Sequence, residues 1–518
     1  MTSTKTTTPS SVTSNRLDRA LQGFLRAIEI VGNKIPHPVA LFVVLIIVLA
    51  FASALMSALG VSVSTSTGET LEVENLLSAD GLRMALNDGL ENFMLFGPFG
   101  TVLVIMMGVS VATQTGYLQN LLVGIVQRVP KKMVTFAVSF AAMIAHVASD
   151  AAYVVMAPIG ATAFYLIGRN PVTGMVLAFV SAGAAYNAAP FITPSDAMFA
   201  GVTTDAAQLV EPGYTVTPVS TIFFTAASSI VMALVFTLLC ETVLEKRVAI
   251  LGSVTEVPDE VKTFEETSVE EAARKKRASQ WSTTALVGIV VVVLLAMIPA
   301  NSPLRAEDGG IEGSPVMSGI AIITALAFLA AGLVYGKLAG SVGSIQRETG
   351  ALMAHGVKEL GPVIALFFFI SQFVAYFQWT NIAGVLSVWG ASMLQAIDLP
   401  IPLLLALLVV VVAIMNVFTL GGIAMYSLTG LILVPMLFSV GVIPEVTQTA
   451  VRIGDCITNP INPLNPYFLW VLTLLKKYIP TAGIGTLASM TVPLALGAGA
   501  VWIVFFVAWI VIGIPLGI

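Results

Sequence analysis

Charged side chains are scarce in this sequence of 518 residues. Asp, Glu, Lys and Arg together make up 10% of the chain, whereas hydrophobic residues make up 57%. A soluble globular domain carries about 25% charged residues, so the composition excludes that class and indicates a polytopic membrane protein that lies in the lipid bilayer. The net charge of −5 is small and no basic patch is present, so no nucleic acid partner is expected.

Cysteine and histidine are also rare. The two cysteines, Cys240 and Cys456, exclude a disulfide framework and a Cys-rich metal site. The three histidines, His37, His146 and His355, are too scattered for a metal centre, so no metal or other cofactor is expected. The N-terminal stretch lacks a short apolar run followed by a small-residue cleavage site, and no cleaved signal peptide is predicted.

Long apolar runs, by contrast, are abundant. A spanning helix needs about 20 apolar residues. Nine segments meet this condition: 38–61, 92–113, 172–190, 217–240, 282–300, 315–336, 361–378, 455–475 and 486–515. Loops rich in Lys and Arg favour the cytoplasmic side. This rule places the N-terminus, its amphipathic surface helix and the loop 246–281 in the cytoplasm, and the acidic loops 62–91 and 301–314 outside. The expected location is the inner, cytoplasmic membrane.

Two further apolar stretches, 133–167 and 401–438, return to the side on which they start. Each has two arms of about 15 residues, or roughly 22 Å, which is shorter than the roughly 30 Å hydrocarbon core. Because neither turn carries a polar loop, we predict two re-entrant hairpins. Two pairs of short spans would satisfy the charge pattern equally well.

The two halves of the chain repeat the same order of features. Gly97-Pro98 and Gly361-Pro362 open corresponding spans 264 residues apart. The broken segment from Asn187 to Pro194 has a counterpart from Asn459 to Pro466, 272 residues later. The first hairpin starts inside and the second outside, so the repeat is inverted. Inverted repeats with paired broken helices are typical of secondary transporters, whose substrate sites lie at the repeat interface.

The predicted fold is therefore an all-α polytopic membrane protein with nine transmembrane helices, two re-entrant hairpins and an inverted repeat. In chain order it has an N-terminal tail with surface helix and first span, a first repeat, a charged cytoplasmic linker, two connecting spans with a surface helix, and a second repeat. These regions cover residues 1–91, 92–245, 246–281, 282–360 and 361–518.

The segment Arg452-Ile-Gly-Asp455, followed by three Asn-Pro pairs ending at Pro466, is the strongest site candidate. An ionisable side chain in hydrocarbon costs roughly 2.5–3.5 kcal/mol, and each Pro removes a backbone hydrogen bond. Irregular backbone survives at membrane depth only where it is buried or lines a site. Arg452 suits a substrate carboxylate and Asp455 suits a proton or cation. Alternatively, the two charges lie one helical turn apart and neutralise each other.

Asparagine and tyrosine side chains extend this candidate site. Asn459 and Asn462 lie in the broken segment, where they either bind substrate or cap freed backbone groups. Asn187, in the first broken segment, is a further candidate for substrate binding. Asn416 and Tyr426 are polar members of the second hairpin and are further candidates for substrate binding.

Three more ionisable residues are candidates for ion or proton coupling. Asp150 lies at the turn of the first hairpin and is either a coupling group or a helix cap. His146, one turn earlier, suits a proton relay or is a satisfied core residue. Asp196 follows the first broken segment and is either a coupling group or a solvated loop residue.

With these features in place, the chain resembles the AbgT-type aminobenzoyl-glutamate transporter family over nearly its whole length. The motifs that carry the resemblance are Gly32-Asn-Lys-Ile-Pro-His37, Ser149-Asp-Ala-Ala-Tyr-Val-Val, Gly168-Arg-Asn-Pro171, Asp196 with Ala200-Gly201, Pro444-Glu-Val, Arg452-Ile-Gly-Asp455 and Gly483-Ile-Gly-Thr486. The resemblance implies a homodimer of nine-helix protomers with two hairpins, a bowl open to the cytoplasm and a folate-related substrate. It also implies substrate or coupling roles for Asp196, Pro444, Arg452 and Asp455.

The hairpins depart from the family pattern. Ala145-His146-Val147 stands where the family typically has Ser-Asn-Thr, so the coupling ion stays open between proton and sodium. Gly421-Gly-Ile-Ala-Met-Tyr426 stands where the family has a small polar run and a Trp.

The expected function is ion-coupled secondary transport of p-aminobenzoyl-glutamate-type folate metabolites, or export of sulfonamide-like antimetabolites, rather than enzyme catalysis. One alternative is a dicarboxylate–cation symporter on the same scaffold, with a small-molecule carboxylate as substrate. The other is an intramembrane enzyme that uses His146 with Asp150, for which the sequence offers no nucleophile or metal partner.

Overall fold

The computed structural model describes residues 38–64, 70–251, 269–299, 301–306, 309–310, 314–397, 399–417 and 422–518. Within these residues the chain is helical apart from loops and a two-stranded sheet. The surface helix predicted before residue 38 and the turn of the second hairpin lie outside the described residues.

The N-terminal part holds one long helix followed by several short elements. Their bounds are α2 (Pro38–Ala58), β1 (Ser62–Ser64), β2 (Thr70–Glu72), α3 (Ala79–Asn87) and α4 (Gly89–Met94). The strands pair antiparallel, with Val63 opposite Leu71. α3 begins where the side chain of Ser78 accepts a hydrogen bond from the backbone N–H of Gly81.

A run of seven helices, α5 to α11, follows. Their bounds are α5 (Gly97–Gln114), α6 (Tyr117–Arg128), α7 (Val134–Ile144), α8 (Ala151–Leu166), α9 (Pro171–Ala184), α10 (Pro194–Ala207) and α11 (Ile222–Leu239). Short 3₁₀ turns flank α7 at Lys131–Met133 and Ala145–Ala148. A π-helical turn at Cys240–Leu244 joins α11 to α12 (Glu245–Leu251). α7 and α8 match the two arms of the hairpin predicted over 133–167.

Between α12 and a second run of seven helices, the described residues form four connecting helices. The connecting helices are α14 (Val269–Ala296), α15 (Pro315–Ser318), α16 (Ile320–Ala339) and α17 (Ile345–Glu359). The second run is α18 (Gly361–Trp379), α19 (Ile382–Ile397), α20 (Ile401–Asn416), α21 (Gly422–Phe438), α22 (Pro444–Ile457), α23 (Pro466–Tyr478) and α24 (Ile484–Ile512). Each helix of the second run starts 262 to 273 residues after the helix at the same place in the first run.

The described residues contain eight helices that are long and apolar enough to cross a membrane. Seven of them coincide with predicted spans: Val39–Ala58, Gly97–Gln114, Ile222–Ile250, Glu270–Ala296, Ile320–Ala339, Gly361–Trp379 and Ile484–Ile512. The eighth, Lys131–Ala148, is the first arm of the first hairpin with its flanking turns, and its 18 residues make it longer than the predicted arm. α12 and α14 also extend into the predicted linker 246–281.

The other two predicted spans, 172–190 and 455–475, are wrong in their boundaries. Each is a pair of short helices with a break between them. α9 and α10 flank the break at 185–193, and α22 and α23 flank the break at 458–465. Arg452 and Asp455 therefore lie on a helix that precedes the break.

The residues at the helix starts explain why each of these two predicted spans is a pair of helices. Pro breaks a helix interior, but it also fits the first turn of a new helix. Asn170, Thr193 and Asn465 each accept a hydrogen bond from a backbone N–H of the helix that begins at the following Pro. A capped Pro thus restarts the helix after each break.

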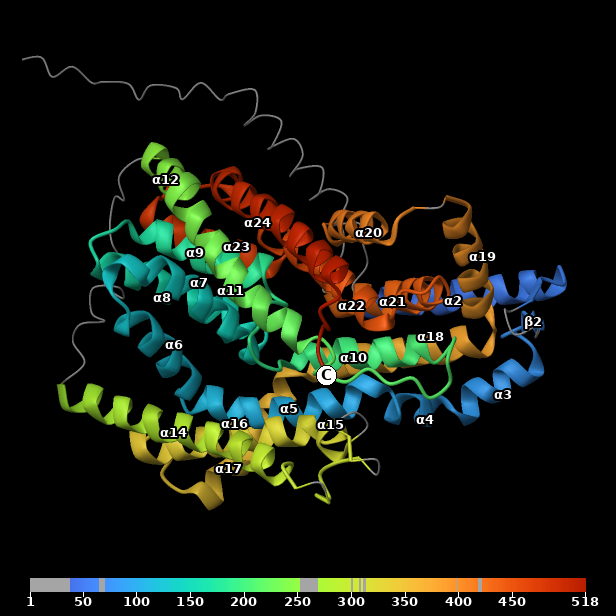
Figure 1. Cartoon of the computed structure of the whole chain (residues 1–518), viewed down its shortest axis with the longest axis horizontal. Helices are drawn as coiled ribbons and strands as arrows, with labels where there is room; N and C mark the ends of the chain where they lie inside the picture. Colours follow the sequence, from blue (N-terminus) through green and yellow to red (C-terminus); the bar gives the residue numbers. More distant parts are fainter. Residues whose placement is uncertain are drawn as a thin grey trace, which may run out of the picture.

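The buried apolar side chains form two clusters. The first cluster joins the first hairpin with α9, α11, α22, α23 and α24. The second joins α2, α5, α10, α16, α18 and α21. Figure 1 shows the first group at the upper left and α5, α14, α16 and α17 along the bottom. α9 and α10 belong to different clusters, so the chain passes from one to the other at residues 185–193.

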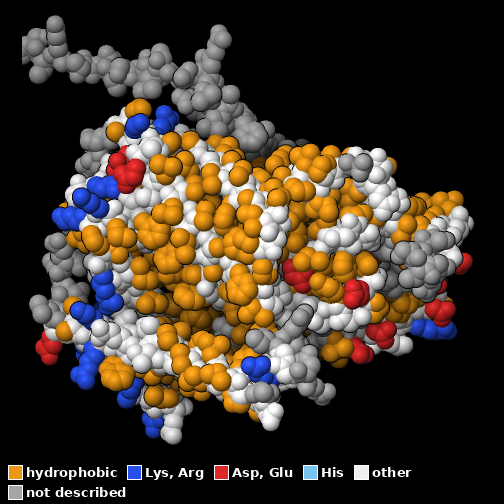
Figure 2. All heavy atoms as spheres, viewed as in Figure 1, with side chains coloured by type: hydrophobic (Ala, Val, Ile, Leu, Met, Phe, Trp, Pro, Cys, Tyr) orange, Lys and Arg blue, Asp and Glu red, His pale blue; other side chains and the backbone are white. Residues whose placement is uncertain are grey.

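Charged side chains gather at the ends of the molecule. In Figure 2 most visible Lys and Arg side chains lie at the end that carries α12 and the start of α14, and acidic side chains appear around α3 and α4 at the opposite end. The broad surface between these ends is mainly hydrophobic, as expected for a surface that faces lipid.

The base of the first hairpin is held by a charged cluster. Arg169, in the turn after α8, donates hydrogen bonds to Glu245 (2.5 and 2.9 Å), Glu241 (2.9 Å) and the hydroxyl of Thr135 on α7 (2.7 Å). Its guanidinium also lies 4.4 Å from the centre of the Phe164 ring. These contacts tie the hairpin to the π-helical turn after α11.

Close glycine contacts set the packing of α8 on α9, which gives a test of the fold. A Cβ on Gly174 would lie 2.1 Å from the carbonyl oxygen of Gly160. We expect Gly174→Ala to destabilise the protein by about 1–3 kcal/mol, because the helices must move apart. The thermal melting temperature of the detergent-purified protein measures this. Gly288→Ala on α14, where a Cβ meets nothing within 4 Å, is the control. Equal melting of the two variants would refute the contact.

Candidate functional site

The break between α9 and α10 lies against α22. The side-chain amide of Asn187 in this break donates hydrogen bonds to the carbonyl oxygen of Arg452 (3.2 Å) and to Sγ of Cys456 (3.0 Å). α9 and α10 both pack on α22. The first broken segment and the charged helix, which are far apart in the sequence, therefore form one site.

Arg452 is the centre of this site. Its Nη2 lies 2.5 Å from Oδ1 of Asp196, and the side chains are only 4% and 6% exposed. The guanidinium also donates to the hydroxyl of Thr221 (3.0 Å) and to Oδ1 of Asn187 (3.4 Å). The Phe199 ring lies 5.2 Å away, at cation–π distance. A buried charge of this kind is stable only when it is paired and hydrogen-bonded.

The predicted neutralisation of Arg452 by Asp455 is wrong, because Arg452 pairs with Asp196 on α10. The interpretation of Asp196 as a solvated loop residue is also wrong. Asp196 lies in the first turn of α10, where its Oδ2 accepts hydrogen bonds from the backbone N–H (2.6 Å) and hydroxyl (2.7 Å) of Thr193. Its other oxygen faces Arg452, so Asp196 fixes the start of α10 and joins it to α22.

Asp455 lies one turn beyond Arg452 and has a different environment. Its side chain is buried, and Oδ1 has no hydrogen-bond partner within the described residues. A Cβ built on Gly422, the first residue of α21, would lie 2.3 Å from Oδ2, so the carboxylate is in contact with the start of this helix. The positive end of a helix dipole favours an anion. An unbonded buried carboxylate oxygen is a place for a proton or a small cation.

Amide side chains satisfy the backbone around the second break. Asn416 at the end of α20 donates to the carbonyl oxygen of Asp455, to Thr458 (3.0 Å) and to Asn459 (3.0 Å). Asn462 donates to the carbonyl oxygen of Asn416 (3.2 Å) and accepts from the backbone N–H after Pro463. In this conformation Asn462 thus bonds backbone groups at the break, and Asn416 is part of the same network.

The tip of the first hairpin forms a second polar group beside the same breaks. The hydroxyl of Tyr186 donates to Oδ1 of Asp150 (3.0 Å) and lies 3.2 Å from Oγ of Ser149. Asp150 precedes α8 but its side chain makes no capping hydrogen bond, so the helix-cap interpretation is wrong. His146 is buried; its Nε2 bonds the carbonyl oxygen of Ala182 (2.8 Å), and its Nδ1 has no partner among the described residues.

Tyr426 and Pro444 are the remaining residues that the sequence predicts for the site. Tyr426 is fully buried, and its hydroxyl lies 2.6 Å from that of Thr203 on α10. The Thr203 hydroxyl also donates to Oε1 of Gln448 (2.7 Å) on α22. Pro444 is the first residue of α22 and is buried. Tyr426 thus joins α21, α10 and α22 in the present conformation and does not face an open space.

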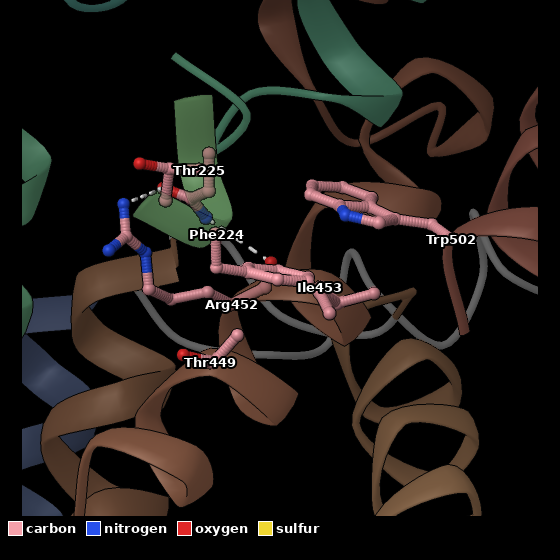
Figure 3. Close-up of a pocket in the computed structure, with 7 residues that line it drawn as sticks. Phe224, Thr225, Thr449, Arg452, Ile453 and Trp502 are labelled. Atoms are coloured by element: carbon pink, nitrogen blue, oxygen red, sulfur yellow. Dashed lines mark hydrogen bonds between the residues drawn. The ribbon is translucent and has the colours of Figure 1, made fainter. Parts of the chain in front are cut away.

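A small cavity adjoins Arg452 (Figure 3). Its volume is about 10 Å³, which is near the lower limit for one water molecule. The lining residues are Asn187, Phe224, Thr225, Thr449, Arg452, Ile453 and Trp502. Nε of Arg452 has no hydrogen-bond partner within the described residues, so one water here would satisfy it. This cavity is too small for an organic substrate, and access to Arg452 requires the surrounding helices to separate.

Several residues of the site are not among those predicted from the sequence. Arg452 is contacted by Thr221 and Phe199, and Asp150 is contacted by Tyr186. The sequence around Thr221 and Phe199 has no motif that predicts these contacts. Tyr186 directly precedes Asn187, and its place in the first broken segment is a signal that could have identified it. Gln448 lies one turn before Arg452 on α22. The predicted span 455–475 begins after this part of the helix.

The Arg452–Asp196 pair gives a stability test. Arg452→Met and Asp196→Asn should each cost about 3–5 kcal/mol, because each leaves an unpaired buried group. The double variant should melt closer to the wild type than either single variant does. Asp80→Asn, in the exposed pair of Asp80 with Arg83, is the control and should not change the melting temperature. Additive losses in the double variant would show that the two residues do not interact.

Comparison with known proteins is consistent with these features. Residues 23–518 match the family model described as "AbgT putative transporter family". The chain is 32% identical over 517 residues to the p-aminobenzoyl-glutamate transport protein of Escherichia coli (strain K12), with 98% of each chain covered.

Two solved structures share the fold. The YdaH transporter of Alcanivorax borkumensis superposes with a TM-score of 0.86 at 34% identity, covering 93% of this chain and 100% of that one. MtrF of Neisseria gonorrhoeae, described as illuminating a class of antimetabolite efflux pumps, superposes with a TM-score of 0.89 at 34% identity, covering 95% and 99%. The molecule is a multi-pass, all-helical membrane protein, and the chain belongs to the AbgT transporter family.

Proposed function

We propose that this protein is an ion-coupled secondary active transporter of p-aminobenzoyl-glutamate-type folate metabolites, with export of sulfonamide-like antimetabolites as a further activity. The observation that carries the proposal is the buried Arg452–Asp196 pair, which joins two broken helices beside the unbonded carboxylate oxygen of Asp455. Broken helices that meet at ionisable groups form the binding sites of secondary transporters. The substrate class is taken from the E. coli relative and the efflux activity from MtrF.

The proposed architecture has nine membrane crossings and two re-entrant hairpins in an inverted repeat. The pairs α9–α10 and α22–α23 each form one broken crossing, and α7–α8 and α20–α21 form the hairpins. The recurring order of seven helices supports the repeat. The Lys and Arg side chains at one end of the molecule support a cytoplasmic N-terminus in the inner membrane. A homodimer is proposed on the family resemblance.

Arg452 is the proposed anion site. Asp196 occupies its guanidinium in the present conformation, and a water-sized cavity adjoins it. A substrate carboxylate would replace Asp196 when the two clusters separate, so that one charge-assisted hydrogen bond replaces another. Further substrate contacts are proposed for side chains at the breaks and the second hairpin: Asn187, Asn416, Tyr426, Pro444, Asn459 and Asn462.

Asp455 is the first candidate for the coupling group, because its Oδ1 is buried and has no hydrogen bond within the described residues. Asp150 and His146 at the tip of the first hairpin are the next candidates. Asp196 would take part by exchanging Arg452 for a proton when substrate binds. Both proton and sodium remain candidate ions, since a carboxylate oxygen binds either.

Transport into liposomes with an imposed gradient tests the function. Purified full-length protein should move p-aminobenzoyl-glutamate when a pH or sodium gradient is imposed, and reversing the gradient should reverse the direction of movement. Failure of both gradients to drive movement would refute ion coupling. Competition by succinate instead of p-aminobenzoyl-glutamate would favour the dicarboxylate symporter and contradict the proposed substrate.

Replacement of Asp455 tests the coupling site. Asp455→Asn keeps the size of the side chain but cannot exchange a proton, so gradient-driven transport should fall at least tenfold while expression and melting temperature are retained. Glu91→Gln, at an exposed position on α4, is the matched control and should transport normally. Full gradient-driven activity of Asp455→Asn would remove Asp455 from the coupling mechanism.

A further inference from the structure

Three tyrosine rings form a ladder beside the tip of the first hairpin. Tyr153 on α8 lies between the other two in the stacking geometry: its ring centre is 4.7 Å from that of Tyr467 and 6.0 Å from that of Tyr186. The interplanar angles are 10° and 16°. The rings come from the first hairpin, the α9–α10 break and the start of α23. Near-parallel rings from three elements form a platform on which another flat ring can stack.

A carboxylate lies at the edge of this ladder. Asp150 is exposed, in contrast to the buried Asp196 and Asp455, and it accepts a hydrogen bond from Tyr186. The hydroxyl of Tyr467 also interacts with this carboxylate. Ser149 before it has a φ of 53°, a conformation that non-glycine residues rarely adopt. Strained backbone of this kind is concentrated at ligand sites, where the fold holds it in place.

The two outer rings are more exposed than the central one, and the ring of His146 lies 4.8 Å from that of Tyr186, so Tyr467 is the end of the ladder at which a further ring would stack. Tyr153 is buried, whereas Tyr186 and Tyr467 are half-buried. An ionised carboxylate accepts hydrogen bonds and donates none, so Asp150 can accept further bonds beyond that from Tyr186. A ligand that suits both features has a flat aromatic ring with N–H donors at its edge.

We propose that Asp150, Tyr186 and Tyr467 form a subsite for the p-aminophenyl group of the substrate. The ring extends the tyrosine ladder and the amine donates to the carboxylate of Asp150. This inference rests on the proposed function, and it assigns the amine end of the substrate to the first hairpin and the carboxylate end to Arg452. Tyr186 and Asn187 are consecutive, so one break contacts both ends of the site.

Equilibrium binding to the full-length protein in detergent tests this subsite independently of coupling. The two probes are p-aminobenzoyl-glutamate and benzoyl-glutamate, which lacks the amine. The wild type should bind the amine compound about tenfold or more tightly, as expected for a hydrogen bond to a charged group. Asp150→Ala should abolish this preference, and Asp150→Asn should reduce it. Asp80→Asn, at an exposed position on α3, should leave it unchanged.

The ring contact is tested separately. Tyr467→Leu should weaken both probes by a similar factor because it removes the stacking surface, whereas Tyr467→Phe should weaken them much less. Tyr165→Leu on the exposed side of α8 is the control. An unchanged ratio of the two affinities in Asp150→Ala, with both probes still bound, would overturn the subsite and leave the proposed function intact. Absence of binding and of liposome transport for p-aminobenzoyl-glutamate in the wild type would overturn both.

Discussion

The ion pair between Arg452 and Asp196 is the interaction on which the rest of the site depends. It joins α22 to α10 where the two apolar clusters meet, and both side chains are almost completely buried. Charges at such a position are costly unless each has a partner, so neither helix can move away without a substitute for the lost contact. A substrate carboxylate or a proton is such a substitute. The pair is therefore suited to a conformational switch, whereas apolar residues of similar size would serve a permanent contact equally well.

The two helix breaks, too, are stable only because buried polar groups find hydrogen-bond partners. Residues 185–193 and 458–465 leave backbone groups without helical partners, and such groups are tolerated at this depth only when protein atoms satisfy them. Inside the second break, Asn462 accepts a hydrogen bond from the backbone N–H of Leu464, and Asn465 donates one to the carbonyl oxygen of Asn459. Asn187, Asn416 and Asn462 donate to the carbonyl oxygens of Arg452, Asp455 and Asn416, respectively, at the ends or faces of neighbouring helices. Consequently the amides link the α9–α10 break, the end of α20 and α22, and any substrate role they take must begin by exchanging these bonds.

The sequence predicted the long apolar helices well because their signal is local: about 20 apolar residues in a row suffice. α10 and α22 were missed for a physical reason. Both helices are buried within protein, so they carry polar residues such as Thr203 and Gln448 that a hydropathy criterion assigns to loops. Arg452, Asp455 and Asp196 are also predicted from the sequence as site residues, but the ion pair between Arg452 and Asp196 is not, and the alternative in which Arg452 pairs with Asp455 is wrong. Arg452 and Asp196 are 256 residues apart, and only the packing of α10 on α22 brings them together.

The balance of charge around the breaks connects this arrangement to ion coupling. Among the described residues, the guanidinium of Arg452 lies near three carboxylates of the candidate site, those of Asp196, Asp455 and Asp150. Three carboxylates and one guanidinium cannot all remain ionised in a medium of low dielectric constant without further positive charge. Asp196 is compensated by Arg452, and Asp150 accepts a hydrogen bond from the hydroxyl of Tyr186. The uncompensated charge therefore falls on Asp455. In the proposed transport cycle, a proton or cation bound there would be exchanged when an anionic substrate changes the occupancy of Arg452.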